Sequence, residues 1–159
     1  MSKRLESKTT LNAEALHAAL VEACPDCSCE VGRLPVDELV VTLPAPCLHR
    51  VVDLLREPFG VYHLSTITGQ DTGTSLELLY HFWQGRGITL RVALPYDAPC
   101  IPTLTGDIPG AAFYEREIAE MLGVTFEGHP NPVPLLLPDS WDAGHPLRQQ
   151  PIDEGSEAP

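Results

Sequence analysis

Residues 75–95, SLELLYHFWQGRGITLRVALP, decide the fold class of this chain. Two runs, 75–83 and 87–95, are rich in leucine, β-branched and aromatic side chains and are separated only by the turn signal QGRG. A link this short joins antiparallel neighbours, because parallel strands need a crossover of a dozen or more residues. The second run places its large apolar side chains at alternate positions, which predicts one buried and one wetter face. These side chains are Ile88, Leu90, Val92 and Leu94.

The residues before this hairpin predict two helices and two further strands. A helix is expected after the N-cap Asn12 and before Cys24, and a second, amphipathic helix within 46–57. The β-branched stretch at 38–43 and the run at 60–70 predict strands. Two helices packed on an antiparallel sheet make an α+β domain.

The residues after Leu94 change in character. The segment 95–110 contains four prolines, which exclude continuous regular structure there. A third helix is predicted at 111–122, ended by Gly123 in the left-handed conformation. One face of this helix is apolar, and its acidic and basic side chains are expected to cover the solvent side. The apolar face contains Tyr114, Ile118, Met121 and Leu122, and the charged residues are Glu115, Arg116, Glu117 and Glu120.

The composition divides the chain into one domain with tails. Residues 1–11 are expected to be a flexible N-terminus and 12–123 the α+β domain. Residues 124–150 read as a Pro-rich, extended C-terminal docking arm, and 151–159 as a disordered acidic tail.

Charge and hydropathy restrict the possible partners. The chain has 159 residues, of which 22 are acidic and 10 basic, giving a net charge of −12. An acidic surface repels phosphate backbones, so nucleic acid is not expected as a partner and a basic protein is favoured. No run approaches the roughly 20 apolar residues of a membrane span, and no secretory signal is visible. We therefore expect a cytoplasmic protein that reaches the membrane only through other subunits.

Five cysteines are present: Cys24, Cys27, Cys29, Cys47 and Cys100. Their odd number and the lack of an export signal argue against a disulfide framework. The cluster CPDCSC (24–29) has a spacing that can begin a zinc or iron–sulfur site, but it needs a fourth ligand, such as Cys47. The alternative favoured by the sequence is a turn built around Pro25 and Asp26.

The tripeptide Gly-His-Pro occurs twice, at 128–130 and 144–146. A metal site would use His129 and His145, but no HxxxH or HExxH pattern places two ligands on one helix face. Catalysis is not favoured either, because Glu115 and Glu117 are two residues apart and point to different sides of a helix.

A docking role explains these corners better. Prolines restrict an extended segment before it binds, so that ordering it on a partner costs less entropy. The apolar run 135–137 lies between prolines, and Trp141 is a typical interface anchor. We therefore interpret the segment as an interface.

Two stretches, YEREIAEMLGVTFEGHPN (114–131) and LLLPDSWDAGHPLRQ (135–149), closely resemble the signature of the 30-kDa subunit family of respiratory complex I, the NADH-quinone oxidoreductase. The resemblance extends over residues 12–150. The matching positions are Glu115, Arg116, Glu117, Gly123, Phe126, Gly128, His129, Pro130, Trp141, Gly144, His145, Pro146, Leu147 and Arg148.

The chain departs from this family at three places. IAEMLG (118–123) lacks the aromatic residue and Asp that commonly precede the glycine, and NPVPLLLPD (131–139) lacks a common arginine. PGAAFYERE (109–117) is similar to the counterpart in membrane-bound [NiFe]-hydrogenases, which keeps a hydrogenase complex as an alternative to a quinone reductase.

The resemblance implies a peripheral-arm structural subunit of a complex I-like, electron-transferring and ion-translocating membrane complex. Such a subunit has no active site, metal or cofactor of its own. It would lie on the cytoplasmic face, against the large 49-kDa-like subunit and with the small iron–sulfur subunit and the membrane arm in the same complex. Iron–sulfur clusters and a quinone or [NiFe] site would belong to the partners. Glu115, Arg116 and Glu117 would form charged pairs, within the domain and across the interface.

Two other classes of function stay open. The first is a stand-alone metal-binding domain that uses the cysteine cluster together with Cys47. The second is a free-standing hydrolase, which is the weaker alternative because no nucleophile–base pair is visible in the sequence.

Overall fold

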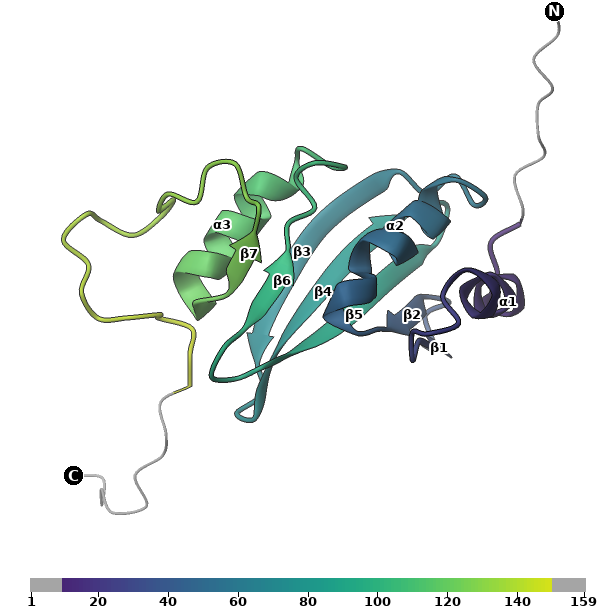
Figure 1. The fold of residues 1–159 in the computed structure, drawn as a ribbon, viewed down its shortest axis with the longest axis horizontal. Coiled ribbons are helices and arrows are strands. Elements are labelled where there is room, and N and C mark those ends of the chain that lie inside the picture. Colours follow the sequence, from purple (N-terminus) through teal and green to yellow (C-terminus); the bar gives the residue numbers. More distant parts are fainter. Residues whose placement is uncertain (1–9, 150–159) are drawn as a thin grey trace, which may run out of the picture.

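A computed structural model describes residues 10–149 and confirms the predicted α+β class (Figure 1). The predicted N-terminal and acidic tails fall almost entirely on residues 1–9 and 150–159, which lie outside the described part. No helix among residues 10–149 is long and apolar enough to cross a membrane.

A five-stranded sheet in the order β1-β2-β5-β4-β3 forms the centre of the domain. The predicted hairpin is present with the expected bounds, and β4 pairs with β5 antiparallel from Ser75↔Pro95 to Trp83↔Gly87. The sheet is mainly antiparallel, but β2 pairs with β5 in parallel, which the sequence did not predict. The strands are β1 (Glu30–Arg33), β2 (Leu39–Thr42), β3 (His63–Asp71), β4 (Ser75–Trp83) and β5 (Gly87–Pro95).

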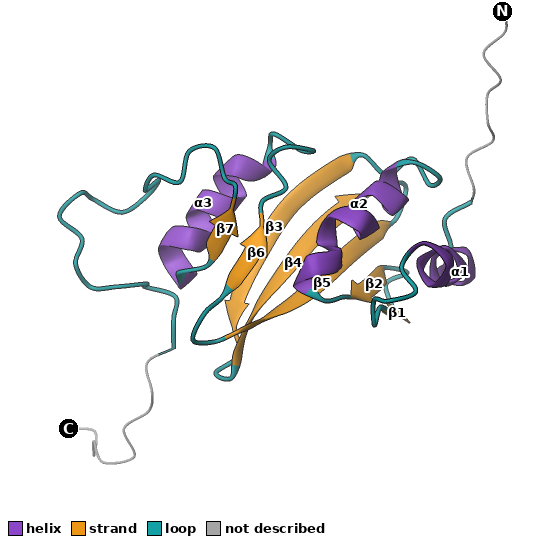
Figure 2. Ribbon diagram, viewed as in Figure 1, coloured by secondary structure: helices purple, strands orange, loops and turns teal. Residues whose placement is uncertain are grey.

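Helix α2 (Leu48–Arg56) lies over one face of this sheet, and helix α1 (Ala13–Ala23) packs beside α2, next to β1 (Figure 2). The side chain of Asn12 accepts a hydrogen bond of 2.8 Å from the Ala15 amide, which confirms the predicted N-cap. The apolar residues of α2 and the alternate residues of the hairpin are buried in one core, as their periodicity predicted. A short 3₁₀ turn, η1 (Ala45–Cys47), precedes α2.

Helix α3 (Ala111–Leu122) packs at the β3 edge of the sheet. Its predicted bounds are confirmed, as is the left-handed Gly123 at its end, with φ 72°. Two short strands, β6 (Cys100–Pro102) and β7 (Thr125–Glu127), pair in parallel beside it. Prolines at 99 and 102 hide β6 from a sequence pattern, because proline is depleted in strands.

The prediction for the cysteines was wrong in one respect. Cys27 and Cys47 form a disulfide, with their Cα atoms 6.5 Å apart. The expected turn at Pro25 and Asp26 is present, and it places Cys27 against the 3₁₀ turn before α2. Among residues 10–149, no group of three or more His, Cys, Asp or Glu side chains is arranged to hold a metal ion.

Gly69 on β3 tests how tightly α3 is packed. A Cβ atom at Gly69 would lie 2.6 Å from Leu122 Cδ1 and 3.3 Å from Ile118 Cγ2, whereas at Gly32 the nearest atom is the Val40 carbonyl oxygen at 3.8 Å. We expect Gly69→Val to lower the free energy of unfolding by about 1–3 kcal/mol through overpacking. Gly32→Val should be neutral or slightly stabilising, because valine favours strands. Urea denaturation of both variants checks this, and equal effects would show that α3 is not packed closely on β3.

Candidate functional site: helix α3 and the C-terminal arm

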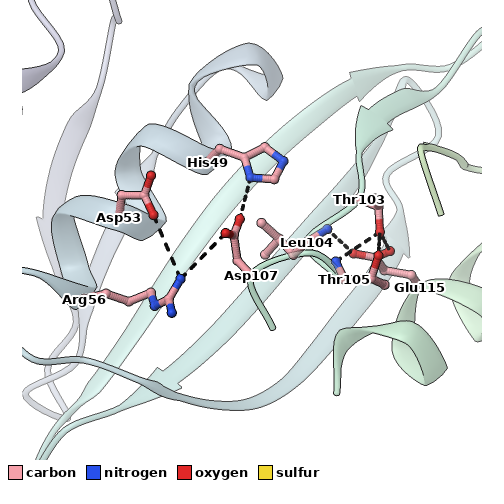
Figure 3. Close-up of polar contacts among 8 residues, drawn as sticks. All are labelled: His49, Asp53, Arg56, Thr103, Leu104, Thr105, Asp107 and Glu115. Atoms are coloured by element: carbon pink, nitrogen blue, oxygen red, sulfur yellow. Dashed lines mark hydrogen bonds and ion pairs between the residues drawn. The ribbon is translucent and has the colours of Figure 1, made fainter. Parts of the chain in front are cut away.

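Glu115 is the most buried charged residue of the predicted motif. Its side chain is 0% exposed, although the sequence placed it on the solvent side of α3, so that prediction was wrong. Its carboxylate accepts a hydrogen bond of 2.7 Å from the Leu104 amide and another from the Thr103 hydroxyl (Figure 3). Glu115 therefore ties α3 to the loop that follows β6.

The same loop reaches helix α2. Asp107 Oδ2 lies 2.7 Å from His49 Nδ1, and Asp107 Oδ1 lies 3.7 Å from Arg56 Nη1 (Figure 3). The loop of residues 103–107 thus joins α2 on one side to α3 on the other. Sequence reasoning missed this link, because it depends on residues 58 positions apart.

Burial raises the pKa of Glu115 above its usual range. The hydrogen bonds from Thr103 and Leu104 and the nearby His129 and His49 act in the opposite direction, but they do not cancel the effect of burial. The folded protein therefore favours a protonated Glu115 more than the unfolded chain does.

The first Gly-His-Pro corner packs against this carboxylate. His129 Nδ1 accepts the Asn131 amide at 3.1 Å, so Nε2 carries the proton and donates to the Ala112 carbonyl oxygen at 3.2 Å. His129 Nε2 also lies 3.9 Å from Glu115 Oε2, and the two side chains are 3% and 0% exposed. This corner fixes the start of the arm to the first half of α3.

We use the term C-terminal arm for residues 124–149, of which 125–127 form β7. Beyond the first corner, the C-terminal arm follows α3 and is held by Arg116 and Glu120. Arg116 donates to the carbonyl oxygens of Val133 and Pro134, at 2.8 and 2.7 Å. One turn later, Glu120 accepts three consecutive backbone amides, from residues 135–137, at 3.2, 2.8 and 2.9 Å. Arg116 thus bonds backbone carbonyls within the chain, and a charged pair across an interface stays a prediction.

The second Gly-His-Pro corner caps the C-terminal end of α3. A helix leaves its last four carbonyl oxygens without partners in the helix. Gly123 N donates to Ala119 O at 2.9 Å, and the C-terminal arm supplies donors for the other three. These are His145 Nδ1 to Glu120 O at 2.9 Å, Leu147 N to Met121 O at 3.0 Å, and Arg148 Nε to Leu122 O at 2.8 Å.

The end of the arm is fastened to the main sheet. Asp71 Oδ2 accepts the Gln149 amide at 2.8 Å and the Tyr96 hydroxyl at 3.0 Å. Partial desolvation raises the pKa of Asp71, but these bonds and one from Gly73 hold it below its usual range overall. Arg148 lies over the Tyr96 ring, 4.7 Å from its centroid.

Several apolar side chains of the C-terminal arm are exposed. Val133, Leu136, Trp141 and Leu147 are 49%, 59%, 43% and 59% exposed. Between the arm and α3 lies a pocket of about 460 Å³, lined by Ala119, Phe126, Val133, Leu137 and Trp141 among others. Trp141 Nε1 donates to Gly144 O at 2.7 Å, which holds the indole at the pocket.

The remaining motif residues divide into two groups. Phe126 is buried in β7, and Gly128 and Gly144 adopt positive φ angles of 80° and 72° at the two corners. Glu117 is exposed, as are Pro130 and Pro146. The structure thus brings most of the predicted residues onto α3, and their role as an interface stays a prediction. Glu120 was not among them, and its spacing of four residues from Arg116 was the available signal.

The sequence of this chain matches a known protein family. The family described as the respiratory-chain NADH dehydrogenase 30-kDa subunit matches residues 41–155. The NADH-quinone oxidoreductase C/D subunit from Gluconacetobacter diazotrophicus is 34% identical in an alignment of 127 residues that covers 70% of this chain and 21% of that protein. Its counterpart from Shewanella oneidensis is 33% identical in an alignment of 124 residues that covers 69% of this chain and 20% of that protein. The chain spans about a fifth of the length of these curated relatives.

Two solved structures share the fold. The trypsin-resistant fragment (1–134) of Nqo5 superposes with a TM-score of 0.58 at 26% identity, over 73% of this chain and 98% of the fragment. A chain of the archaeal membrane-bound sulfane sulfur reductase superposes with a TM-score of 0.59 at 23% identity, over 85% of this chain and 79% of that one. The second likeness concerns the fold alone.

The raised pKa of Glu115 predicts how stability depends on pH. A carboxyl group whose pKa is raised by folding stabilises the protein below about pH 4.3, the value in an unfolded chain, and this contribution is lost as the pH rises through the folded pKa. Glu115→Gln keeps an acceptor for Leu104 and cannot ionise. We therefore expect the stability of Glu115→Gln relative to the wild type to increase from pH 4.5 to pH 8, measured by urea denaturation. A difference that does not change with pH would contradict the burial of an ionisable Glu115.

Gly123 tests the cap formed by the C-terminal arm. Gly123 and Gly85 both have a φ of 72°, but a Cβ atom at Gly123 would lie 2.5 Å from the His145 ring, while none of the surrounding atoms is within 4 Å at Gly85. Alanine at either site carries the same backbone cost, of about 1–2 kcal/mol. Gly123→Ala should cost about 1–3 kcal/mol more, because His145 must move off Glu120 O. The measurement is the difference in unfolding free energy between the two variants, and equal losses would mean that the arm is not seated on α3.

Proposed function

The chain belongs to the 30-kDa subunit family of respiratory-chain NADH dehydrogenases, and we propose from this premise that it is a structural subunit without an active site of its own. Its place would be the peripheral arm of a complex I-like, ion-translocating membrane complex, on the cytoplasmic face. There it packs against the large 49-kDa-like subunit. Redox cofactors, namely iron–sulfur clusters and a quinone site, belong to the partner subunits in this proposal.

The observation that carries the proposal is the way the C-terminal arm is held. Its backbone is fixed by Arg116, Glu120 and the end of α3, so one side of the arm is used by contacts within the chain. The arm also exposes apolar side chains, among them Trp141 and Leu136. A segment that is ordered beforehand loses little entropy on binding, and large exposed apolar side chains are typical of an interface.

The equivalent subunit of a membrane-bound [NiFe]-hydrogenase is the second candidate. The stretch 109–117 resembles that group, and the same fold occurs in the archaeal sulfane sulfur reductase complex, which is not named as a quinone reductase. In both candidates this chain has the same structural role. The difference lies in the large subunit, where a hydrogenase carries cysteine ligands for the [NiFe] site.

A tagged copy of the chain tests this proposal. After extraction of the membrane with a mild detergent, we expect a large 49-kDa-type or hydrogenase-like subunit, an iron–sulfur subunit and membrane proteins of the complex to co-purify, as identified by mass spectrometry. Cysteine ligands for [NiFe] in that large subunit would separate the second candidate from the first. Purification of the chain alone, with the membrane fraction free of it, would contradict both.

A further inference from the structure

The pocket between α3 and the C-terminal arm has walls that are set before any partner binds. On the α3 side it is formed by Ala119 and by the polar heads of Arg116 and Glu120, which are engaged with the arm. On the other side Trp141 is held by its bond to Gly144 O. A preformed concave site of about 460 Å³ is large enough for one bulky side chain and part of its flanking backbone.

The lining of this pocket is mostly apolar. Val124 and Phe126, which are 3% and 8% exposed, line it together with Val133, Leu137 and Trp141 of the arm. An apolar pocket with aromatic side chains in its lining favours an aromatic or branched aliphatic occupant, because burying such a group releases water from both surfaces.

The charge next to the pocket is negative. Asp139 lines it, and Asp142 follows Trp141; both are exposed, and neither forms a salt bridge within residues 10–149. The nearest arginines are already engaged: Arg116 binds the Val133 and Pro134 carbonyl oxygens, and Arg148 binds Leu122 O. A cation on the partner would therefore meet unpaired carboxylates, and the net charge of −12 favours its approach.

We propose that this pocket receives an aromatic or branched aliphatic side chain of the large partner subunit, flanked by Lys or Arg. This inference rests on the proposed function and adds the chemistry of the contact. The apolar side chain enters the pocket beside Ala119, and the cation pairs with Asp139 and Asp142 at the rim. The apolar contact in the pocket fixes the position of the partner. The carboxylates of Asp139 and Asp142 increase the rate of association and make it depend on salt.

A pair of alanine-to-phenylalanine variants tests the apolar contact. Ala119→Phe fills the pocket from α3, whereas Ala93→Phe adds the same group to an exposed position of β5. Both variants should keep the melting temperature of the isolated chain within a few degrees. In the tagged full-length chain, we expect Ala119→Phe to reduce the recovered large subunit at least about tenfold and Ala93→Phe to leave it unchanged.

The outcomes separate this inference from the proposed function. If the wild type recovers no large subunit, the proposed function fails. If the wild type and Ala119→Phe recover it equally, the function stands and the pocket inference is overturned. If the isolated chain forms a dimer that Ala119→Phe dissociates, as measured by light scattering, the occupant is a second copy and the inference is also overturned.

A second pair of variants tests the flanking cation. We expect Asp139→Asn with Asp142→Asn to weaken association at low salt by about tenfold and to flatten its salt dependence. Asp26→Asn with Glu30→Gln removes the same number of exposed carboxylates far from the pocket and should change neither. An unchanged salt dependence in the first pair would exclude a cation at this rim.

Discussion

The carbonyl oxygens in the last turn of α3 need hydrogen-bond donors from outside the helix. The carbonyl oxygens of Glu120, Met121 and Leu122 have no partner within the helix, and an unpaired polar group costs about 1–3 kcal/mol when it is shielded from water. His145, the Leu147 amide and Arg148 supply the missing donors. Arg148 and its positive charge are also favourable at the negative end of the helix dipole. The C-terminal arm is therefore part of the folded domain.

The path of the C-terminal arm around α3 explains why a buried carboxylate is needed at Glu115 and a glycine at Gly123. The arm must leave α3, turn back beside it and return to its end, so the loop after β6, the first corner and the second corner all meet this one helix (Figure 1). The buried carboxylate of Glu115 accepts the Leu104 amide of this loop. Gly123 has no side chain, which leaves room for the ring of His145. The arm is thus held by contacts within the chain, while some of its apolar side chains, such as Leu136, stay exposed.

The sequence predicts well what depends on local pattern. The hairpin of β4 and β5, helix α3 and its glycine cap follow from alternation, helical periodicity and turn signals, and their bounds agree with the structure. The parallel pairing of β2 with β5, the short strands β6 and β7 and the disulfide of Cys27 with Cys47 depend on segments brought together by folding. No local pattern encodes such contacts. Glu115 was misplaced for the same reason, since the Thr103 and Leu104 groups that receive it lie outside the helix.

The C-terminal arm is seated on α3 in the chain by itself, before any partner binds. Hydrogen exchange of the backbone amides of Leu135, Leu136 and Leu137 in the purified full-length chain tests this most directly, because all three donate to the Glu120 carboxylate. We expect slowed exchange at these amides in the wild type, and we expect Glu120→Ala to remove this protection while the amides of β4 stay protected. Exchange at the rate of an unstructured peptide in the wild type would contradict it, and would mean that the arm is ordered only on a partner.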